Sequence, residues 1–548
     1  MKAKPLTHTK HPTPESLTQP DKGQADAPLA QAVFRYAAED PLRLHFPGHK
    51  GRALSPMAAR LMGHALTYDL TELPGLDDLF ASSGPIERAQ ALAAQAFGSE
   101  RAFFLVGGAS AGVVAALWSA LSDGDVLALA RTSHRSAVSA LLLSGATPLW
   151  ARGSYEAPCY VPIAVSADKL LARASPLNPD CILVTSPTYE GLLADSAGAA
   201  MARSVRAQAP PRTSAGPVPA GDRPTIVVDE AHGAHMYFLD TATATASAAA
   251  SASARLNPAP ALDQDIDACI HGAHKTLGSL TGTGILHLKG RRLDPGRVNQ
   301  ALLTIQTSSP SYLMMASLDL ARRDMVMNGR RWLAEVVAEA GAARQGLTSA
   351  GIEFCRLDQP SDPTRLIVGS AQFGMTGRGL FTRLREQGVQ AEQAGLLYVL
   401  FVFSIGDSPG SGLRLVEALT RIQMTARAWP DPAWPVPDNA RTRPGGCGHD
   451  VARATGAAQV LAGMDLPVAA VTPRQAWAAG WLEVPMGESV DRVAAESIFL
   501  YPPGAALLVA GEIVPSWLPG VVKELALLEA HFQGPADRSM ATLRVVEG

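Results

Sequence analysis

The stretch that decides the fold is VDEAHGAH at residues 228–235, taken together with a second motif, IHGAHKTLGSLTGTG, at residues 270–284. Asp229 follows a short apolar run, residues 225–228, and so lies at the end of a predicted strand. Lys275 stands among small and hydroxyl residues. An acid facing a pyridine nitrogen and a lysine that forms a Schiff base are the two groups that pyridoxal phosphate requires. Together the two segments predict a site for this cofactor.

Each segment also has a purely structural interpretation. Asp229 could cap the next element, and Lys275 could be an ordinary solvated lysine. Most of the 47 basic residues are arginines, however, and a lysine between His274 and Thr276 and close to glycines is poorly placed for an exposed helical face. The presence of both segments therefore favours a functional role.

Outside these segments, short apolar runs alternate with helical stretches from residue 29 onwards. The predicted strands lie at residues 102–105, 126–130, 148–150, 181–185, 226–228 and 284–288, and the predicted helices include residues 85–97 and 110–121. This alternation predicts an α/β fold with a mostly parallel sheet. Functional residues in such a fold collect where strands end at their carboxyl edge. The residues just after these strand ends include Gly107, Ser133, Ser186 and Asp229.

The turn VGGASAG at residues 106–112 joins a predicted strand to an apolar helix. The amides of Ala109, Ser110 and Ala111 would open the helix N-terminus, which suits a phosphate group. Turns of small residues are often merely tight turns, so this motif depends on its register with Asp229 and Lys275.

Three further polar residues are candidates for the same site. His134, in TSHRS, could lie over the cofactor ring or be a surface histidine in a loop. Ser186, in LVTSPTYEG, could cap a helix or reach the cofactor or substrate. His274, beside the lysine, is predicted to assist proton transfer or to contact phosphate.

Bulk composition excludes several classes of protein. The 548 residues, 47 % of them hydrophobic, predict two or three globular domains. A net charge of −3 and the absence of a basic block give no case for nucleic acid binding. No apolar run reaches the roughly 20 residues of a spanning helix, so no membrane segment is expected.

The cysteines are scattered singly without CxxC spacing, at Cys159, Cys181, Cys269, Cys355 and Cys447. Neither a metal site nor a disulfide framework is expected from this spacing, and a reducing cytoplasm fits best.

The chain is predicted to divide into four parts: a flexible arm at residues 1–28, a cofactor-binding major domain at 29–310, a smaller α/β lobe at 311–428 and a C-terminal domain at 445–548. Long loops are expected near residues 198–223 and 240–264, the second rich in Ala, Ser and Thr. A stretch dense in Pro and Trp, residues 429–444, is the predicted linker.

At this point the sequence resembles the fold-type I pyridoxal-phosphate decarboxylases of ornithine, lysine and arginine, in the shorter form that lacks an amino-terminal wing domain. The resemblance covers nearly the whole chain from about residue 29. It rests on HFPGHKG (45–51), YDLTELPGLDDLFASSGPI (68–86), SHRSAVSALLLSGATP (133–148), SPTYEG (186–191), VDEAHGAH, AHKTL (273–277), SSPSYLMMASLD (308–319) and YPPGAALLVAGE (501–512).

The resemblance implies a fold with helices on both faces of the sheet and a role for each matching residue. Lys275 would be the Schiff-base lysine, Asp229 the partner of the pyridine nitrogen and His134 the histidine stacked on the ring. The remaining implied cofactor contacts are His232, His274, Ala109 and Ser110. The family forms homodimers or multiples of dimers, with active sites at the subunit boundary.

Two positions depart from the family pattern. Gly272 and Ala109 stand where hydroxyl residues commonly contact the phosphate, so weaker retention of the cofactor is expected.

The implied reaction is decarboxylation of a basic amino acid to its amine and carbon dioxide, with arginine narrowly preferred over lysine and ornithine by fold-level analogy. An aminotransferase or lyase on the same fold is one alternative, because Asp229 and Lys275 establish only the cofactor. A non-catalytic regulatory relative is another.

Overall fold

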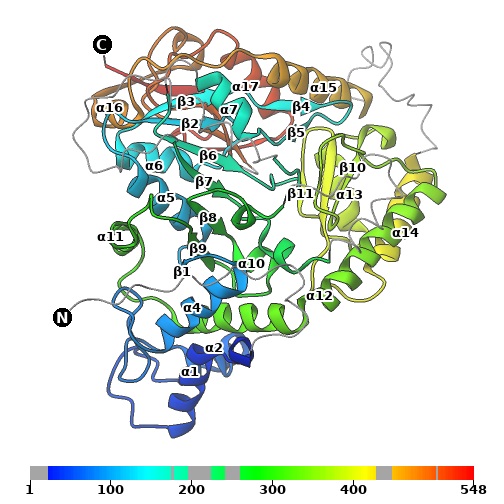
Figure 1. Ribbon diagram of the computed structural model, residues 1–548. Helices are drawn as coiled ribbons and strands as arrows, with labels where there is room; N and C mark the ends of the chain where they lie inside the picture. The colour runs from blue at the N-terminus through cyan, green and yellow to red at the C-terminus, as the bar shows by residue number, and fades with distance from the viewer. Residues whose placement is uncertain are drawn as a thin grey trace.

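A seven-stranded sheet forms the centre of the computed structural model, which describes residues 22–174, 178–194, 224–240, 259–426, 447–501 and 504–547 (Figure 1). The strand order is β1-β9-β8-β7-β6-β2-β3. The bounds are β1 Arg101–Leu105, β2 Val126–Ala130, β3 Thr147–Ala151, β6 Cys181–Thr185, β7 Thr225–Asp229, β8 Ala268–His271 and β9 Gly284–Leu288. Only β9 runs antiparallel to its neighbours, β1 and β8, so the prediction of a mostly parallel sheet is confirmed.

Helices cover both faces of this sheet because its central strands are apolar on both sides. Along β7, Val227 contributes to one core and Val228 to the other, as the two-residue period of a strand requires. One face packs against α5 Gly108–Ala120, α6 Ser136–Ser144 and α11 Pro295–Ile305. The opposite face packs against α1 Pro28–Glu39, α4 Pro85–Phe97, α7 Ala167–Ala174 and the long helix α12 Tyr312–Ser349.

Helix α12 connects the central sheet to a smaller lobe. Its first half packs on the sheet, whereas Val336 and Leu347 belong to the core of the lobe. That lobe is an antiparallel sheet in the order β10-β12-β11. Its elements are β10 Arg365–Gly369, α13 Gly377–Glu386, β11 Gln393–Ala394, β12 Tyr398–Val402 and α14 Ser411–Ala426.

The C-terminal region, coloured orange to red, lies beside the β2–β3 side of the central sheet (Figure 1). Its helices are α15 Cys447–Gly463, α16 Pro473–Ala478 and α17 Leu518–Leu527. Its strands are β13 Trp481–Pro485, β14 Ile498–Tyr501, β15 Ala505–Leu508, β16 His531–Gln533 and β17 Thr542–Val546. Arg131, just after β2, donates hydrogen bonds to the carbonyls of Ala506 and Leu507.

The remaining elements are short. They are α2 Pro56–Met62, α3 Ala65–Tyr68, α10 Ala273–Thr276, the hairpin of β4 Ser154–Glu156 and β5 Val161–Ile163, and single 3-10 turns such as η3 Ala234–Phe238. Among the described residues, no helix combines the length and the apolar character needed to cross a membrane.

The expectation that the cysteines stay unpaired is wrong for two of them. A disulfide joins Cys159, beside the β4–β5 hairpin, to Cys355 in the small lobe. The partners are 196 residues apart in sequence, so local spacing gives no sign of the bond. Cys181 and Cys269 are free and buried. The cytoplasmic location stays a prediction.

Several predicted features fall wholly or largely outside the described residues. These are the arm up to residue 21, the loop at 198–223, residues 241–258 of the second loop and the linker at 429–444. The domain boundaries stay predictions.

Candidate active site

The carboxyl ends of β7 and β8 bring together the VDEAHGAH segment and the AHKTL segment. The strands are parallel, with Asp229 beside Ile270, and α10 begins two residues after β8 ends and carries Lys275. Asp229 is buried, and its Oδ1 atom accepts a hydrogen bond of 3.2 Å from the amide of Ala231. The acid and the lysine therefore lie at one edge of the sheet, as the sequence predicts.

The amine of Lys275 lies 2.8 Å from Nε2 of His232. Burial lowers the pKa of Lys275, Arg365 lowers it further, and the nearby carboxylate of Asp229 opposes the change without cancelling it. Burial and the neighbouring Lys275 hold the pKa of His232 well below its usual range. A lowered pKa increases the share of neutral amine, which is the form in which a lysine acts as a nucleophile.

His134 follows the end of β2 and belongs to the same site. Its Nδ1 atom accepts a hydrogen bond of 3.3 Å from the amide of Ser136 and lies 2.9 Å from Oγ of that residue. Burial lowers the pKa of His134, and the charges of Asp229 and Lys275 act on it in opposite directions. The ring is therefore fixed in place and favoured in its neutral form.

The start of α5 provides a place for an anionic group. Gln306 accepts hydrogen bonds from the amides of Val106 and Gly107, and the helix has no side-chain cap. The first-turn amides of a helix have no carbonyl partner within it, and those of Ala109, Ser110 and Ala111 are such groups. A cavity of about 570 Å³ lies against this turn, and its lining includes Gly107, Ser110, Ala111 and His134.

The residues present fit pyridoxal phosphate. Within the described residues, the buried hydroxyls of Ser133 and Thr185 have no hydrogen-bond partner. They lie at the ends of β2 and β6, the same edge of the sheet as Asp229. Unpaired buried polar groups are costly, so their presence here favours a polar ligand.

Gly272 departs from the family pattern for a steric reason. A β-carbon at this position would lie 2.8 Å from the carbonyl oxygen of Ala231 and 3.1 Å from Cδ of Lys275. The amide of Gly272 also donates to the same carbonyl at 3.2 Å. The chain after β8 therefore approaches the β7 loop too closely for a serine.

Two predicted cofactor contacts have structural roles as well. Oγ of Ser186 accepts a hydrogen bond of 3.0 Å from the amide of Ala194, and the amide of Ser186 donates to the carbonyl of Asp229. His274 uses Nδ1 to donate to the carbonyl of Thr283 at 2.8 Å. Their contact with a cofactor stays a prediction.

The small lobe supplies one side of the site, and the sequence alone does not predict this side. Arg365, at the start of β10, is buried and acts electrostatically on both Lys275 and His232. Tyr189, within SPTYEG, packs against His232 with 4.7 Å between ring centroids. Its hydroxyl donates a hydrogen bond to Glu392 of the small lobe.

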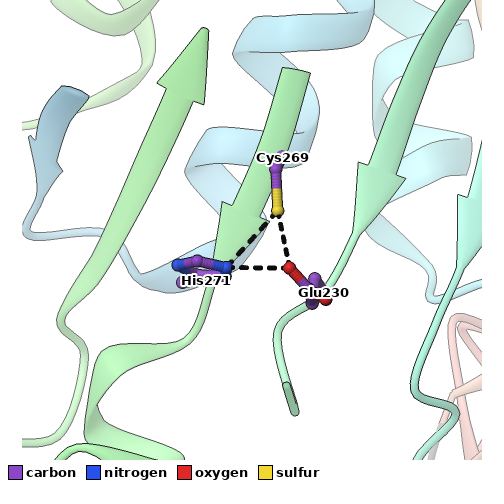
Figure 2. Close-up of side chains that lie close together, drawn as sticks. All are labelled: Glu230, Cys269 and His271. Carbon is purple, nitrogen blue, oxygen red and sulfur yellow. Dashed lines mark hydrogen bonds and ion pairs between the residues drawn. The ribbon is translucent and has the colours of Figure 1, made fainter. Parts of the chain in front are cut away.

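A second group of polar side chains, Glu230, Cys269 and His271, lies buried where the residue after β7 meets β8 (Figure 2). Oε2 of Glu230 is 3.0 Å from Nε2 of His271 and from Sγ of Cys269, and it accepts a 2.7 Å hydrogen bond from the hydroxyl of Tyr237. Burial would raise the pKa of Glu230, but these partners more than offset it and the pKa is lowered. The three side chains are of types that bind metals, and Glu230, Cys269 and Nε2 of His271 are hydrogen-bonded to one another, whereas Nδ1 of His271 has no partner among the described residues. These hydrogen bonds connect the residue after β7 to β8.

Comparison with known proteins places this site in a family. Residues 27–365 match the family described as Orn/Lys/Arg decarboxylase, major domain. The chain therefore belongs to the Orn/Lys/Arg decarboxylase family, whose members are pyridoxal-phosphate-dependent amino acid decarboxylases of fold-type I. The predicted family, fold and enzyme class are confirmed.

Individual relatives cover nearly the whole chain. An arginine decarboxylase of Bacillus subtilis is 30% identical over 540 residues, which is 96% of this chain and 98% of that protein. The lysine decarboxylase LdcA of Pseudomonas aeruginosa is 24% identical and covers 88% of this chain and 73% of its own. The structure of the constitutive lysine decarboxylase of Escherichia coli has the same fold, with a TM-score of 0.74, 20% identity and coverage of 95% of this chain and 82% of that one.

Proposed function

We propose that this enzyme removes the α-carboxylate of arginine and releases agmatine and carbon dioxide. The observation that supports a cofactor site for this reaction is the placement of Lys275, His232 and Asp229 at the ends of adjacent strands, with the amine of Lys275 2.8 Å from the imidazole, and the family membership supports decarboxylation. The choice of arginine rests on the likeness to the Bacillus subtilis enzyme over 96% of this chain.

The proposed contacts with the cofactor follow from the geometry of the site. Lys275 would hold it covalently, Asp229 would keep its ring nitrogen protonated, His134 would cover the ring and the first-turn amides of α5 with Ser110 would hold the phosphate. His232 and Ser186 would complete the contacts. Pyridoxal phosphate supplies an electron sink that accepts the pair left when carbon dioxide departs.

The chain itself supplies the route for the proton. Lys275 and His232 are within hydrogen-bond distance, with 2.8 Å between the amine and Nε2, so a proton can pass between them. The pair can therefore deliver a proton to the substrate α-carbon after carbon dioxide leaves. The pair is partly buried, which limits the access of bulk water to this transfer.

We propose that a second copy of the chain covers the segment around α2. Large apolar side chains there are strongly exposed, which is unusual for an isolated subunit. They are Leu42, Leu44, Phe46, Leu54, Met57 and Leu61. Sedimentation analysis of the holoenzyme should show a dimer or a multiple of dimers, and a monomer at micromolar concentration would contradict this assembly.

A substrate panel tests the proposed reaction. Purified holoenzyme is incubated with arginine, lysine, ornithine or diaminopimelate, and amines and carbon dioxide are measured. We expect agmatine to form fastest, and Lys275→Ala to abolish both turnover and the borohydride-reducible link between cofactor and protein. A keto acid product instead of carbon dioxide would show an aminotransferase, and turnover of none of the four would overturn the proposal.

A further inference from the structure

Three buried side chains from two segments of the chain converge where β7 ends (Figure 2). Glu230 directly follows β7, whereas Cys269 and His271 lie two residues apart on β8, so their side chains leave the same face of the sheet. The side chains of Glu230 and His271 are 4% and 0% exposed, and Cys269 is 0% exposed. A carboxylate, a thiol and an imidazole therefore meet in a place that bulk water does not reach.

The three atoms that face one another are spaced closely enough to share one ion. Oε2 of Glu230 lies 3.0 Å from Sγ of Cys269 and 3.0 Å from Nε2 of His271, and the sulfur lies 3.4 Å from the nitrogen. In a triangle with these sides, a point about 1 Å above the plane is about 2.1 Å from each corner. Zinc binds carboxylate oxygen and imidazole nitrogen at about 2.0–2.2 Å and thiolate sulfur at about 2.3 Å. The ion therefore fits once the sulfur moves outward by about 0.2 Å.

The charges of the three side chains suit a divalent cation of this kind. A carboxylate and a thiolate carry two negative charges together, which Zn²⁺ neutralises, and binding releases the single thiol proton. Neutrality matters in a buried site because an uncompensated charge there is costly. Mg²⁺ and Ca²⁺ prefer oxygen ligands alone, so a set that includes a thiolate and an imidazole selects Zn²⁺.

Further contacts orient these side chains. Glu230 accepts a 2.7 Å hydrogen bond from the hydroxyl of Tyr237 at Oε2 and a 3.1 Å hydrogen bond from the amide of Ala261 at Oε1. Nδ1 of His271 has no partner among the described residues, nor has Nε2 of His287, whose ring centroid lies 4.7 Å from that of His271. A histidine that binds zinc through Nε2 carries its proton on Nδ1, and the neighbouring imidazole offers an acceptor for it.

We propose that Glu230, Cys269 and His271 bind a Zn²⁺ ion that holds the residue after β7 to β8. An oxygen from water or from Tyr237 completes the tetrahedral coordination. The ion is structural and takes no part in the proposed reaction, but it fixes the ends of the two strands that lead to the candidate active site. The cysteine spacing gives no sign of such a site, because Cys269 lies 39 residues from Glu230 and belongs to no CxxC pair.

Zinc analysis of the untagged holoenzyme tests this site. The protein is purified from zinc-supplemented medium and dialysed against EDTA, which removes ions bound at the surface. Plasma mass spectrometry should find about one zinc per chain in wild type, because buried ligands prevent exchange, and at least about tenfold less in Cys269→Ser. Cys181→Ser is the matched control, since Cys181 is also free and buried, on β6 of the same sheet, and this variant should retain the ion.

X-ray absorption at the zinc edge of wild type gives an independent measurement should Cys269→Ser fail to fold. It should show one sulfur at about 2.3 Å and nitrogen or oxygen neighbours at about 2.0–2.2 Å. Wild type with less than about 0.1 zinc per chain, equal zinc in wild type and Cys269→Ser, or a zinc shell without sulfur would each overturn the site. The proposed decarboxylation is tested separately by the substrate panel.

Discussion

Replacing Arg131 by methionine should loosen the C-terminal region from the central sheet. The guanidinium donates to the carbonyls of Ala506 and Leu507 at 2.8 and 2.9 Å and to both carboxylate oxygens of Glu512 at 2.6 and 2.8 Å. The side chains of Arg131 and Glu512 are 5% and 1% exposed, so water cannot take over these bonds. Removing one partner of a buried pair costs about 3–5 kcal/mol, because the other charge stays buried and unpaired. Methionine retains much of the aliphatic length, so the loss of packing should be smaller.

Urea unfolding followed by tryptophan fluorescence measures this loss, because the guanidinium carbon of Arg131 lies 4.9 Å from the centroid of the Trp150 ring. The control is Arg331→Met, which breaks an exposed pair with Glu335 whose side chains are 65% and 64% exposed and should cost at most about 0.5 kcal/mol. Adding Glu512→Gln to Arg131→Met should recover part of the loss by removing the stranded charge. A free energy of unfolding no lower for Arg131→Met than for the control would refute this reasoning.

Three further predictions concern the active site. Asp229→Asn should retain the fold by circular dichroism but lower kcat by orders of magnitude, and activity within a few-fold of wild type would exclude its role. Gly272→Ser should speed cofactor loss on dialysis, because its β-carbon would meet the carbonyl of Ala231 at 2.8 Å; slower loss would show that a hydroxyl is accommodated. Attachment of cofactor to the apoprotein requires the neutral form of Lys275, whose pKa is lowered by burial, so its rate should reach half-maximum below the ordinary value of about pH 10.4; an unshifted midpoint would contradict this.

The strands of the central sheet could be predicted because their burial leaves uninterrupted apolar runs. The exception is β8, where Cys269 and His271 interrupt the run. His271 can be buried only because Glu230, 41 residues earlier, accepts its hydrogen bond. A partner so distant in sequence leaves no local signal, so the sequence does not predict this strand, although it does predict the role of Lys275 that follows it.

The candidate site likewise has one part that the sequence predicts and one part that it does not. Asp229, Lys275 and His134 follow strand ends of one sheet, so strand topology alone brings them together. Arg365 and Glu392 belong to a different lobe, and their position depends on how α12 carries that lobe back to the sheet edge. Gly272 shows a further limit, since a missing hydroxyl looks like a lost contact until the distance to Ala231 is known.

The candidate active site joins groups from two parts of the fold. The groups proposed to hold the cofactor come from the central sheet, whereas Arg365 and Glu392 come from the small lobe. Tyr189 connects the two through its ring on His232 and its hydroxyl on Glu392. Changes at the lobe edge should therefore leave the placement of Lys275 and Asp229 unaltered. Changes at the strand ends should instead lower kcat for every substrate alike.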